Sequence, residues 1–214
     1  MGVLKRNKYL EGVYIRPLVY VSTESVVKFN LNKLDCGFAI YTVPLGHFFD
    51  VANGIKIKVS SWTRVSSGSI PPGAKPTGIY LNTCLAKTEV EDLGFGEAVL
   101  LNSDGSISEG SAENIFLVKD GNLVTPSLDQ NILEGITRNT IIELAKSEFG
   151  IKTIQRKIMA NELETADEIF LTGTGAEVTP VNTVGLITKR LQQLYFDVVH
   201  GKVNKYSHWL TYAR

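Results

Sequence analysis

The chain has 214 residues, of which 43% are hydrophobic and 21% charged; this is the composition of a globular protein and excludes wholesale disorder. Its 22 basic and 22 acidic side chains give a formal net charge of zero, so no overall field would hold nucleic acid or an anionic membrane. No apolar run approaches the roughly 20 residues of a membrane-spanning helix, and the N-terminal residues resemble neither an export signal nor a lipid-anchor motif. We therefore expect a cytoplasmic protein that binds neither nucleic acid nor membranes.

The first part of the chain predicts strands. Residues 13–22 and 37–43 are β-branched and aromatic runs, and the second is continuous enough for a strand covered on both faces. Residues 55–62 alternate between apolar and polar side chains, as a half-buried strand does. The stretch 46–54 holds two glycines and predicts a linker between a short N-terminal region, residues 1–45, and a larger domain, residues 55–214.

The larger domain predicts a mixed α/β order. A loop rich in Ser, Gly and Pro precedes a helix over 78–93, with Gly94 at its expected end. Three short strands joined by turn sequences are interpreted as a β-meander. A helix over Ile136–Phe149 is expected to end at Gly150 in the left-handed conformation. The remaining predicted elements are the meander strands 98–101, 115–119 and 123–125, strands 152–157 and 168–171, a short helix near 161–165 and a final helix over 187–199.

The cysteines and histidines indicate no metal or disulfide chemistry. Cys36 and Cys84 are far apart and form no C-x-x-C motif, so we interpret them as reduced, buried thiols. His47, His200 and His208 have no metal-ligand spacing with one another or with the cysteines. No metal site is predicted.

Two segments could bind an anion through backbone amides. Gly135-Ile136-Thr137 opens the second long helix, where unpaired N–H groups favour phosphate, although Thr137 could equally be an ordinary first-turn residue. The turn Gly173–Ala176 follows a predicted strand and could form an anion-binding nest or a simple chain reversal. Neither Gly94-Phe95-Gly96 nor Gly173-Thr174-Gly175 completes a dinucleotide-binding G-x-G-x-x-G motif.

Two charged side chains lie in predicted loops, and each is open to two interpretations: an ordinary solvated charge or a functional group. Glu109 lies in a turn of small residues between predicted strands, and is either a solvated loop charge or a buried carboxylate facing a cation. Lys75 follows the Ser-, Gly- and Pro-rich loop, and most lysines in such places are solvated.

Taken in order along the chain, these signals resemble one enzyme family. The order comprises Val59–Arg64 (VSSWTR), Lys75, Tyr80, Ile107–Phe116 (ISEGSAENIF), Gly135–Arg138 (GITR) and Gly173–Pro180 (GTGAEVTP). It is similar to the fold-type IV pyridoxal-phosphate enzymes, and within them most similar to the branched-chain amino acid aminotransferases, over nearly the whole chain. The resemblance implies a mixed α/β fold like that of D-amino acid aminotransferase, with pyridoxal 5'-phosphate as cofactor.

The resemblance also implies a role for individual residues. Lys75 matches the lysine that forms a Schiff base with the cofactor, Tyr80 the tyrosine that reaches its ring oxygen, and Glu109 the carboxylate that pairs with its pyridine nitrogen. The backbone of Ile136 and Thr137, together with Thr174, matches the family's phosphate site. The backbone of Gly175 and Ala176 matches the site of the substrate carboxylate. Tyr14 and Arg16 match a Y-x-R segment at the substrate pocket, which accepts the side-chain carboxylate of glutamate.

These roles are physically reasonable for the residue types concerned. A lysine attacks a carbonyl or removes a proton only as the neutral amine, so we expect Lys75 to be desolvated. The charge that develops at the substrate Cα drains into the cofactor ring, and an anionic Glu109 at low dielectric would keep the ring nitrogen protonated.

The resemblance implies that part of the family's small N-terminal lobe, including its phosphate-binding arginine, is absent from this sequence, and that residues 1–45 are the remnant of that lobe. The expected reaction is amino transfer between Leu, Ile or Val and 2-oxoglutarate, by a homo-oligomer. Two alternatives remain open: elimination, as in aminodeoxychorismate lyases, against which the Y-x-R segment argues, and a truncated, non-catalytic large lobe.

Overall fold

The computed structural model describes residues 2–7, 9, 12–24, 28–46 and 49–212. The chain divides into two compact units, one of residues 1–48 with 211–214 and the other of residues 49–210. The division between them lies within the predicted linker 46–54.

The smaller unit is built on a two-stranded antiparallel ribbon. Strands β1 (Val13–Val21) and β2 (Cys36–Pro44) pair in register from Val13 opposite Pro44 to Val21 opposite Cys36. Helix α1 (Gly2–Asn7) is joined to the ribbon by a hydrogen bond from Asn7 Nδ2 to Thr42 Oγ1 of 2.9 Å. A 3-10 turn, η1 (Leu31–Lys33), lies in the connection between the two strands.

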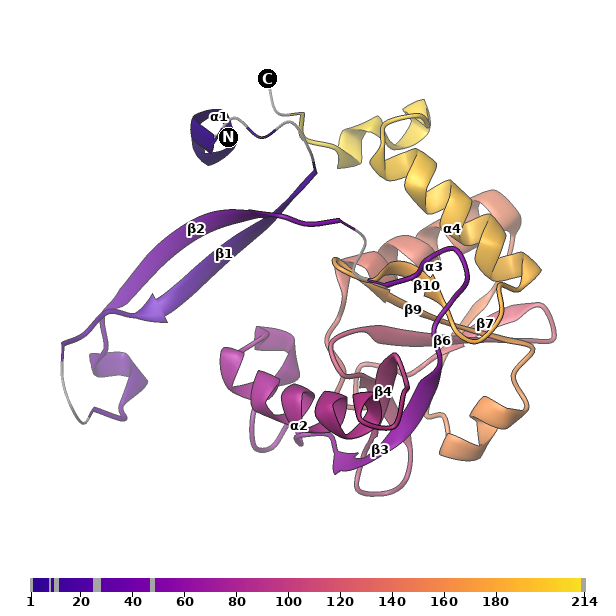
Figure 1. Cartoon of the computed structure of the whole chain (residues 1–214), viewed down its shortest axis with the longest axis horizontal. Helices are drawn as coiled ribbons and strands as arrows, with labels where there is room; N and C mark the ends of the chain where they lie inside the picture. The colour runs from indigo at the N-terminus through magenta and orange to yellow at the C-terminus, as the bar shows by residue number, and fades with distance from the viewer. Residues whose placement is uncertain (1, 8, 10–11, 25–27, 47–48, 213–214) are drawn as a thin grey trace. The chain divides into compact units, whose positions relative to one another are not determined.

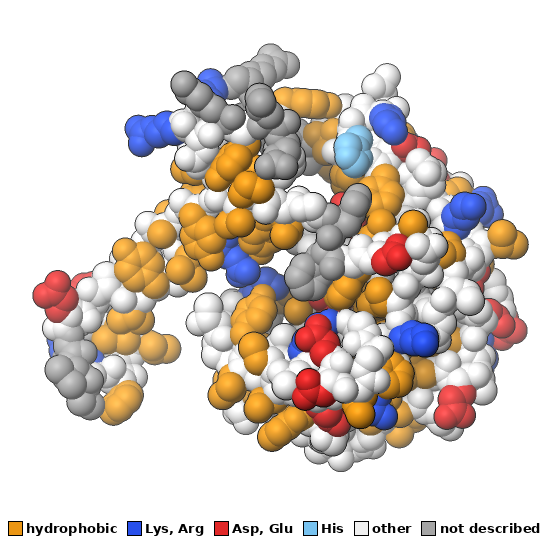
Figure 2. Space-filling view, in the orientation of Figure 1, with side chains coloured by type: hydrophobic (Ala, Val, Ile, Leu, Met, Phe, Trp, Pro, Cys, Tyr) orange, Lys and Arg blue, Asp and Glu red, His pale blue; other side chains and the backbone are white. Residues whose placement is uncertain are grey.

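Strand β2 is not covered on both faces, so the expectation from its apolar run is wrong. Its large apolar side chains are exposed, as are several on β1, because a two-stranded ribbon has no further layer of its own to pack against. Figure 2 shows apolar side chains along this ribbon. The exposed apolar residues are Ile15, Val19, Tyr20, Val21, Phe38, Ile40, Tyr41 and Val43.

The larger unit is arranged in layers, with helices outside and two sheets inside (Figure 1). Its strands are β3 (Ile57–Thr63), β4 (Glu97–Leu101), β5 (Ile107–Gly110), β6 (Asn114–Lys119), β7 (Asn122–Thr125), β8 (Thr153–Gln155), β9 (Glu168–Gly173) and β10 (Glu177–Pro180). Its α-helices are α2 (Tyr80–Glu91), α3 (Ile136–Phe149) and α4 (Leu186–Val199). The 3-10 turns are η2 (Pro72–Ala74), η3 (Thr77–Ile79), η4 (Ala160–Glu164) and η5 (Asn204–Trp209).

The core of the larger unit consists of apolar side chains between successive layers. Helix α2 packs on β4 through Ala86, Val90, Ala98 and Leu100. Helices α3 and α4 lie side by side on the five-stranded sheet, where the rings of Phe116 and Phe170 stack with centroids 4.9 Å apart. The cluster between the two sheets contains Val99, Ile107, Ile115, Leu117, Val124, Ile158, Leu171 and Val181.

The predicted β-meander is wrong, because the chain changes sheets within it. Strands β3, β4 and β5 form a three-stranded sheet, whereas β6 and β7 belong to a five-stranded sheet of order β10-β9-β6-β7-β8. The short turn between Gly110 and Asn114 carries the chain from one sheet to the other. Strand β5, which precedes this turn, was not among the predicted elements because it is only four residues long and mostly polar.

Several other predictions about local structure are tested directly. Helix α3 has the predicted bounds, and Gly94 and Gly150 follow their helices with φ of +81° and +64°. The cysteines are free, as expected, but both are exposed, because Cys36 lies on the ribbon and Cys84 on the outer face of α2. The expectation that they are buried is therefore wrong.

Candidate active site

Lys75 lies on the connection between β3 and α2, immediately after the turn η2. Its φ of +48° is in the left-handed region, and its N–H donates to the carbonyl of Pro72 at 3.1 Å. Its Nζ is 6.0 Å from the ring centroid of Tyr80, which begins α2. The expectation that Lys75 is desolvated is wrong. Its side chain is exposed, because it lies on a loop and not in an element packed between layers.

Glu109 is buried at the end of β5, with 4% of its surface exposed, which excludes its interpretation as a solvated loop charge. Its Oε1 pairs with the guanidinium of Arg64, and its Oε2 accepts hydrogen bonds from Asn114 Nδ2 at 2.9 Å and from the N–H of Leu133 at 3.0 Å. Burial raises the pKa of Glu109 to about 7, against the lowering effects of Arg64, the Leu133 N–H and the charge of Lys75. The side chain is thus a desolvated carboxylate that faces cations.

Arg64 is a site residue to which the sequence interpretation assigned no role. It follows β3, its Nε donates to the carbonyl of Asn131 at 3.3 Å, and its backbone N–H donates to Leu101. Its Nη1 is buried and has no hydrogen-bond partner among the described residues. A buried donor without a partner is costly, so this atom favours a bound acceptor next to Glu109. The V-S-S-W-T-R run contained the only signal that could have identified it.

Asn114 connects Glu109 to the beginning of helix α3. Besides its bond to Glu109, Asn114 Nδ2 donates to the carbonyl of Leu133 at 2.8 Å. A Cβ placed on Gly135 would lie 2.1 Å from Asn114 Oδ1, so only glycine fits at this approach. Glu109, Asn114 and the entry to α3 therefore form one hydrogen-bonded unit.

The N-terminus of α3 is a suitable anion site. Gly135 is its N-cap, and among the described residues no side chain accepts from the N–H groups of Ile136, Thr137 or Arg138. Ile136 is exposed, whereas Thr137 is buried and its side chain interacts with the hydroxyl of Tyr195. Burial raises the pKa of that tyrosine. Open N–H groups with an aligned helix dipole favour phosphate.

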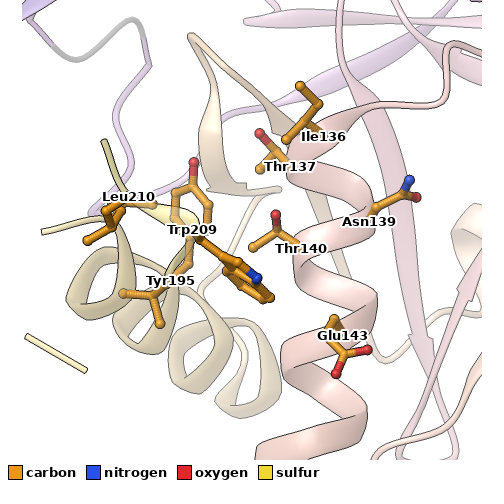
Figure 3. A pocket seen from close by; sticks show the side chains of 10 residues that line it. Ile136, Thr137, Asn139, Thr140, Glu143, Tyr195, Trp209 and Leu210 are labelled. Carbon is orange, nitrogen blue, oxygen red and sulfur yellow. The ribbon is translucent and has the colours of Figure 1, made fainter. Parts of the chain in front are cut away.

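A pocket lies beside this helix terminus, between α3, α4 and the C-terminal turn η5 (Figure 3). Its wall is mainly apolar, with a few hydroxyl groups. The apolar side chains include Val198, Val199, Trp209 and Leu210, and the hydroxyl groups are those of Thr137, Thr140 and Tyr195.

Thr174, Gly175 and Ala176 form the turn of the β9–β10 hairpin, which is the predicted chain reversal. Thr174 is exposed and Ala176 is buried. A Cβ placed on Gly173 would lie 3.6 Å from Glu113 Cγ, so this turn adjoins the turn that follows Glu109.

The other predicted substrate residues belong to the smaller unit. Tyr14 and Arg16 lie on the same face of β1, with the Arg16 guanidinium carbon 5.2 Å from the Tyr14 ring centroid. Within the larger unit, the structure brings Glu109 to the entry of α3 and Lys75 beside Tyr80.

Among the described residues, no group of three His, Cys, Asp or Glu side chains could hold a metal ion. His47 lies outside the described residues. None of the helices in the described part of the chain combines the length and the hydrophobicity that a membrane span requires.

The arrangement fits a cofactor with an aldehyde, a ring nitrogen and a phosphate. An amine, a buried carboxylate with an unpartnered cationic donor beside it, and an uncapped helix N-terminus are all present in the larger unit. Each matches one group of pyridoxal phosphate by charge and hydrogen bonding.

Comparisons with known proteins agree with this chemistry. A family model described as amino-transferase class IV matches residues 2–184. The chain is 46% identical to a probable branched-chain-amino-acid aminotransferase of Aquifex aeolicus, covering 98% of this chain and 70% of that protein.

Two solved structures are similar in fold. The branched-chain aminotransferase of Thermoproteus uzoniensis with norvaline has a TM-score of 0.93 at 40% identity, over 97% of this chain and 71% of that one. The branched-chain amino acid aminotransferase of Thermobaculum terrenum in its PLP form has a TM-score of 0.91 at 33% identity, over 98% and 71%. The chain thus spans about 70% of the length of the relatives it matches.

Proposed function

The chain belongs to the class IV aminotransferase family, and from that premise we propose that it exchanges an amino group between branched-chain L-amino acids and 2-oxoglutarate. It is a pyridoxal-phosphate enzyme of the fold-type IV class, and the relatives that it matches along nearly its whole length are branched-chain aminotransferases. The choice of 2-oxoglutarate as acceptor is supported by the Y-x-R pair of Tyr14 and Arg16, whose guanidinium matches a side-chain carboxylate in charge.

A single observation carries the assignment of the cofactor site. The buried carboxylate of Glu109 is tied through Asn114 to the segment that enters the uncapped helix α3. One hydrogen-bonded unit thereby presents an acid for the ring nitrogen and N–H groups for the phosphate. The cofactor requires both, because its ring nitrogen and its phosphate are a fixed distance apart.

The protein's own residues have distinct tasks in this proposal. Lys75 would hold the cofactor aldehyde through its amine and, once the substrate amine has taken its place, would carry a proton between the substrate Cα and the cofactor. Tyr80, beside it, would donate a hydrogen bond to the ring oxygen. Arg64 lowers the pKa of Glu109 against the effect of burial, and so favours the anion that would hold the ring nitrogen protonated. When bound, pyridoxal phosphate supplies an aldehyde and an electron-withdrawing ring.

The anionic groups of cofactor and substrate go to backbone amides. The N–H groups of Ile136 and Thr137, with Thr174, would hold the phosphate, and those of Gly175 and Ala176 would hold the substrate carboxylate. Both segments adjoin the stretch where the chain passes between the sheets, since Gly173 approaches Glu113 and Gly135 approaches Asn114.

We also propose that the protein is a cytoplasmic homo-oligomer. The exposed apolar side chains of the β1–β2 ribbon support an association, because exposed apolar area of this kind is stabilised by contact. Sedimentation of the chain at rising concentration tests it, and a monomer at all concentrations would refute it.

The test of function uses the chain with added pyridoxal phosphate. We expect a visible absorption band that Lys75→Ala removes and that Lys146→Ala, an exposed lysine on α3, leaves unchanged. Leucine then converts the band and releases the corresponding 2-oxo acid, and 2-oxoglutarate reverses the conversion. Retention of turnover in Lys75→Ala would refute the proposal, and turnover only of an aminochorismate-type substrate would establish the lyase alternative.

A further inference from the structure

A pair of buried acids lies beneath the β5–β6 turn and has no task in the proposed reaction. Glu97 belongs to β4 and is 1% exposed, and Glu113 ends the turn and is 6% exposed. Buried carboxyl groups are rare unless paired, so their position calls for a physical account.

The two carboxyl groups are both bound to the backbone of the turn. Glu97 Oε1 accepts from the N–H groups of Ala98 at 2.6 Å and Ser111 at 3.3 Å, and its Oε2 accepts from Lys87 Nζ at 3.0 Å. Glu113 Oε2 accepts from the N–H of Ala112 at 3.1 Å, so the two carboxyl groups are bound to N–H groups of neighbouring residues in one turn. Two carboxyl groups can share a hydrogen bond only if one of them carries a proton.

The local charge balance assigns that proton to Glu113. The charged groups that face its carboxyl are Glu97 from β4 and Lys87 from α2, and Lys87 also pairs with the exposed Glu91 at 3.4 Å. With one shared proton, Lys87, Glu97 and Glu113 sum to zero; with none, a net negative charge is buried. Burial, and then the charge of Glu97, raises the pKa of Glu113 to about 8.

The acid pair holds the turn that separates the elements of the cofactor site. From α2, Thr83 Oγ1 donates to the carbonyl of Ser111 at 2.6 Å, so the turn is fixed from that side too. On its other side, a Cβ on Gly173 would lie 3.6 Å from Glu113 Cγ and 3.8 Å from the Ala112 carbonyl. The residue after Glu113 is Asn114, which binds Glu109.

We propose that Glu113 is a positioning residue, which shares one proton with Glu97 and thereby fixes the β5–β6 turn against the Gly173–Ala176 turn that binds the cofactor phosphate and the substrate. The inference rests on the proposed function for the meaning of that second turn. Loss of the shared proton places two buried anions side by side, so the turn loosens and the cofactor is held less tightly above the midpoint of that titration.

The first test needs no cofactor. The 214-residue chain, labelled with ¹³C at the glutamate carboxyl and with ¹⁵N, is titrated by NMR from about pH 5 to about pH 9. We expect one carboxyl to titrate well above the ordinary glutamate range and to disappear in Glu113→Gln, and the amide signals of Gly173 and Thr174 to follow it in the parent only. The proposal would be overturned if no such carboxyl is found, or if the amide signals of that turn do not change with pH as the carboxyl titrates.

The second test measures pyridoxal-phosphate binding by absorbance over the same range. We expect the dissociation constant of the parent to rise about tenfold relative to that of Glu113→Gln across the titration, because glutamine can donate to Glu97 without losing a proton. Glu113→Ala should bind weakly at every pH, whereas Glu164→Gln, an exposed acid on η4, should behave as the parent. Parallel pH curves for parent and Glu113→Gln would overturn the proposal. A parent that binds no cofactor would refute the proposed function, while the first test would still decide the acid pair.

Discussion

Helices α3 and α4 begin in the same way but satisfy their first N–H groups differently. Each follows a glycine that is closely approached by one polar side chain, Asn114 at Gly135 and Glu168 at Gly185. At α4, the Glu168 carboxylate accepts from the N–H groups of Ile187 and Thr188 at 3.0 and 2.7 Å and from the Thr188 hydroxyl at 2.7 Å. At α3, among the described residues, the corresponding N–H groups have no acceptor.

The difference teaches where this protein can bind an external anion. A helix N-terminus carries unpaired donors and a partial positive charge, and an internal carboxylate removes both. The first N–H groups of helix α4 are satisfied in this way, and these hydrogen bonds stabilise the fold. At α3, Asn114 uses its amide to hold Glu109 and Leu133 instead, so the helix remains open for a phosphate.

Substitution of the glycine before each helix by alanine is expected to give the largest change in free energy. Gly135→Ala pushes Asn114 out of contact with Glu109 and Leu133, and we expect pyridoxal-phosphate affinity to fall by about 100-fold, or about 2.7 kcal/mol. Gly185→Ala displaces Glu168 and should lower the stability of the fold while leaving affinity within about threefold. Titration by absorbance and unfolding by urea separate the two, and equal losses of affinity would contradict the distinction.

Removing the carboxylate at α4 is expected to give the next largest effect. Glu168→Ala leaves the first N–H groups of α4 without an acceptor, so the free energy of unfolding should fall by about 2 kcal/mol. Urea unfolding followed by circular dichroism measures it, with the exposed Glu164→Ala as control. A fall in cofactor affinity at unchanged stability would show that the two helix ends are not separate in function.

The acid that supports α3 should make stability depend on pH. Because burial raises the pKa of Glu109 from the ordinary 4.5 to about 7, the folded chain binds an extra proton between those values. Stability should therefore fall as pH rises through that window, by at most about 1.4 kcal/mol per unit from this group. Glu109→Gln removes this contribution. Thermal unfolding measures the slopes, and identical slopes for parent and variant would contradict the burial of an ionisable group there.

The smallest expected effect is that of inorganic phosphate on the chain without cofactor. An anion bound at α3 stabilises the fold by mass action, and phosphate at about its dissociation constant contributes only about 0.4 kcal/mol. The melting temperature should rise with phosphate in the parent and not in Gly135→Ala. A rise of equal size in both would place the anion elsewhere.

The sequence predicted elements better than it predicted how they are covered. The helical spacing of apolar residues in α3 and the glycine that follows it predict both ends of that helix, because these signals are local in the sequence. The change of sheet between Gly110 and Asn114 and the exposure of β2 depend on which layer lies next to which, and a strand pattern carries no such information.

The same limit applied to the candidate site. Lys75, Glu109 and Thr137 were identifiable because their motifs occur in a distinctive order, and their roles remain predictions. The partners of Glu109 could not be derived, since Arg64 and Leu133 are 45 and 24 residues away in the sequence. For Lys75 the loop context favoured a solvated side chain and the family resemblance a desolvated one; the structure shows it exposed, which depends on what packs over a loop.

The central claim is that α3, and not α4, receives the cofactor phosphate. It is tested most directly by following the backbone ¹⁵N–¹H signals of the chain during titration with pyridoxal phosphate. The account predicts that the signals of Ile136, Thr137 and Arg138 shift with the binding curve while those of Ile187 and Thr188 stay in place. Unmoved signals at the start of α3 in a chain that has bound the cofactor would contradict it.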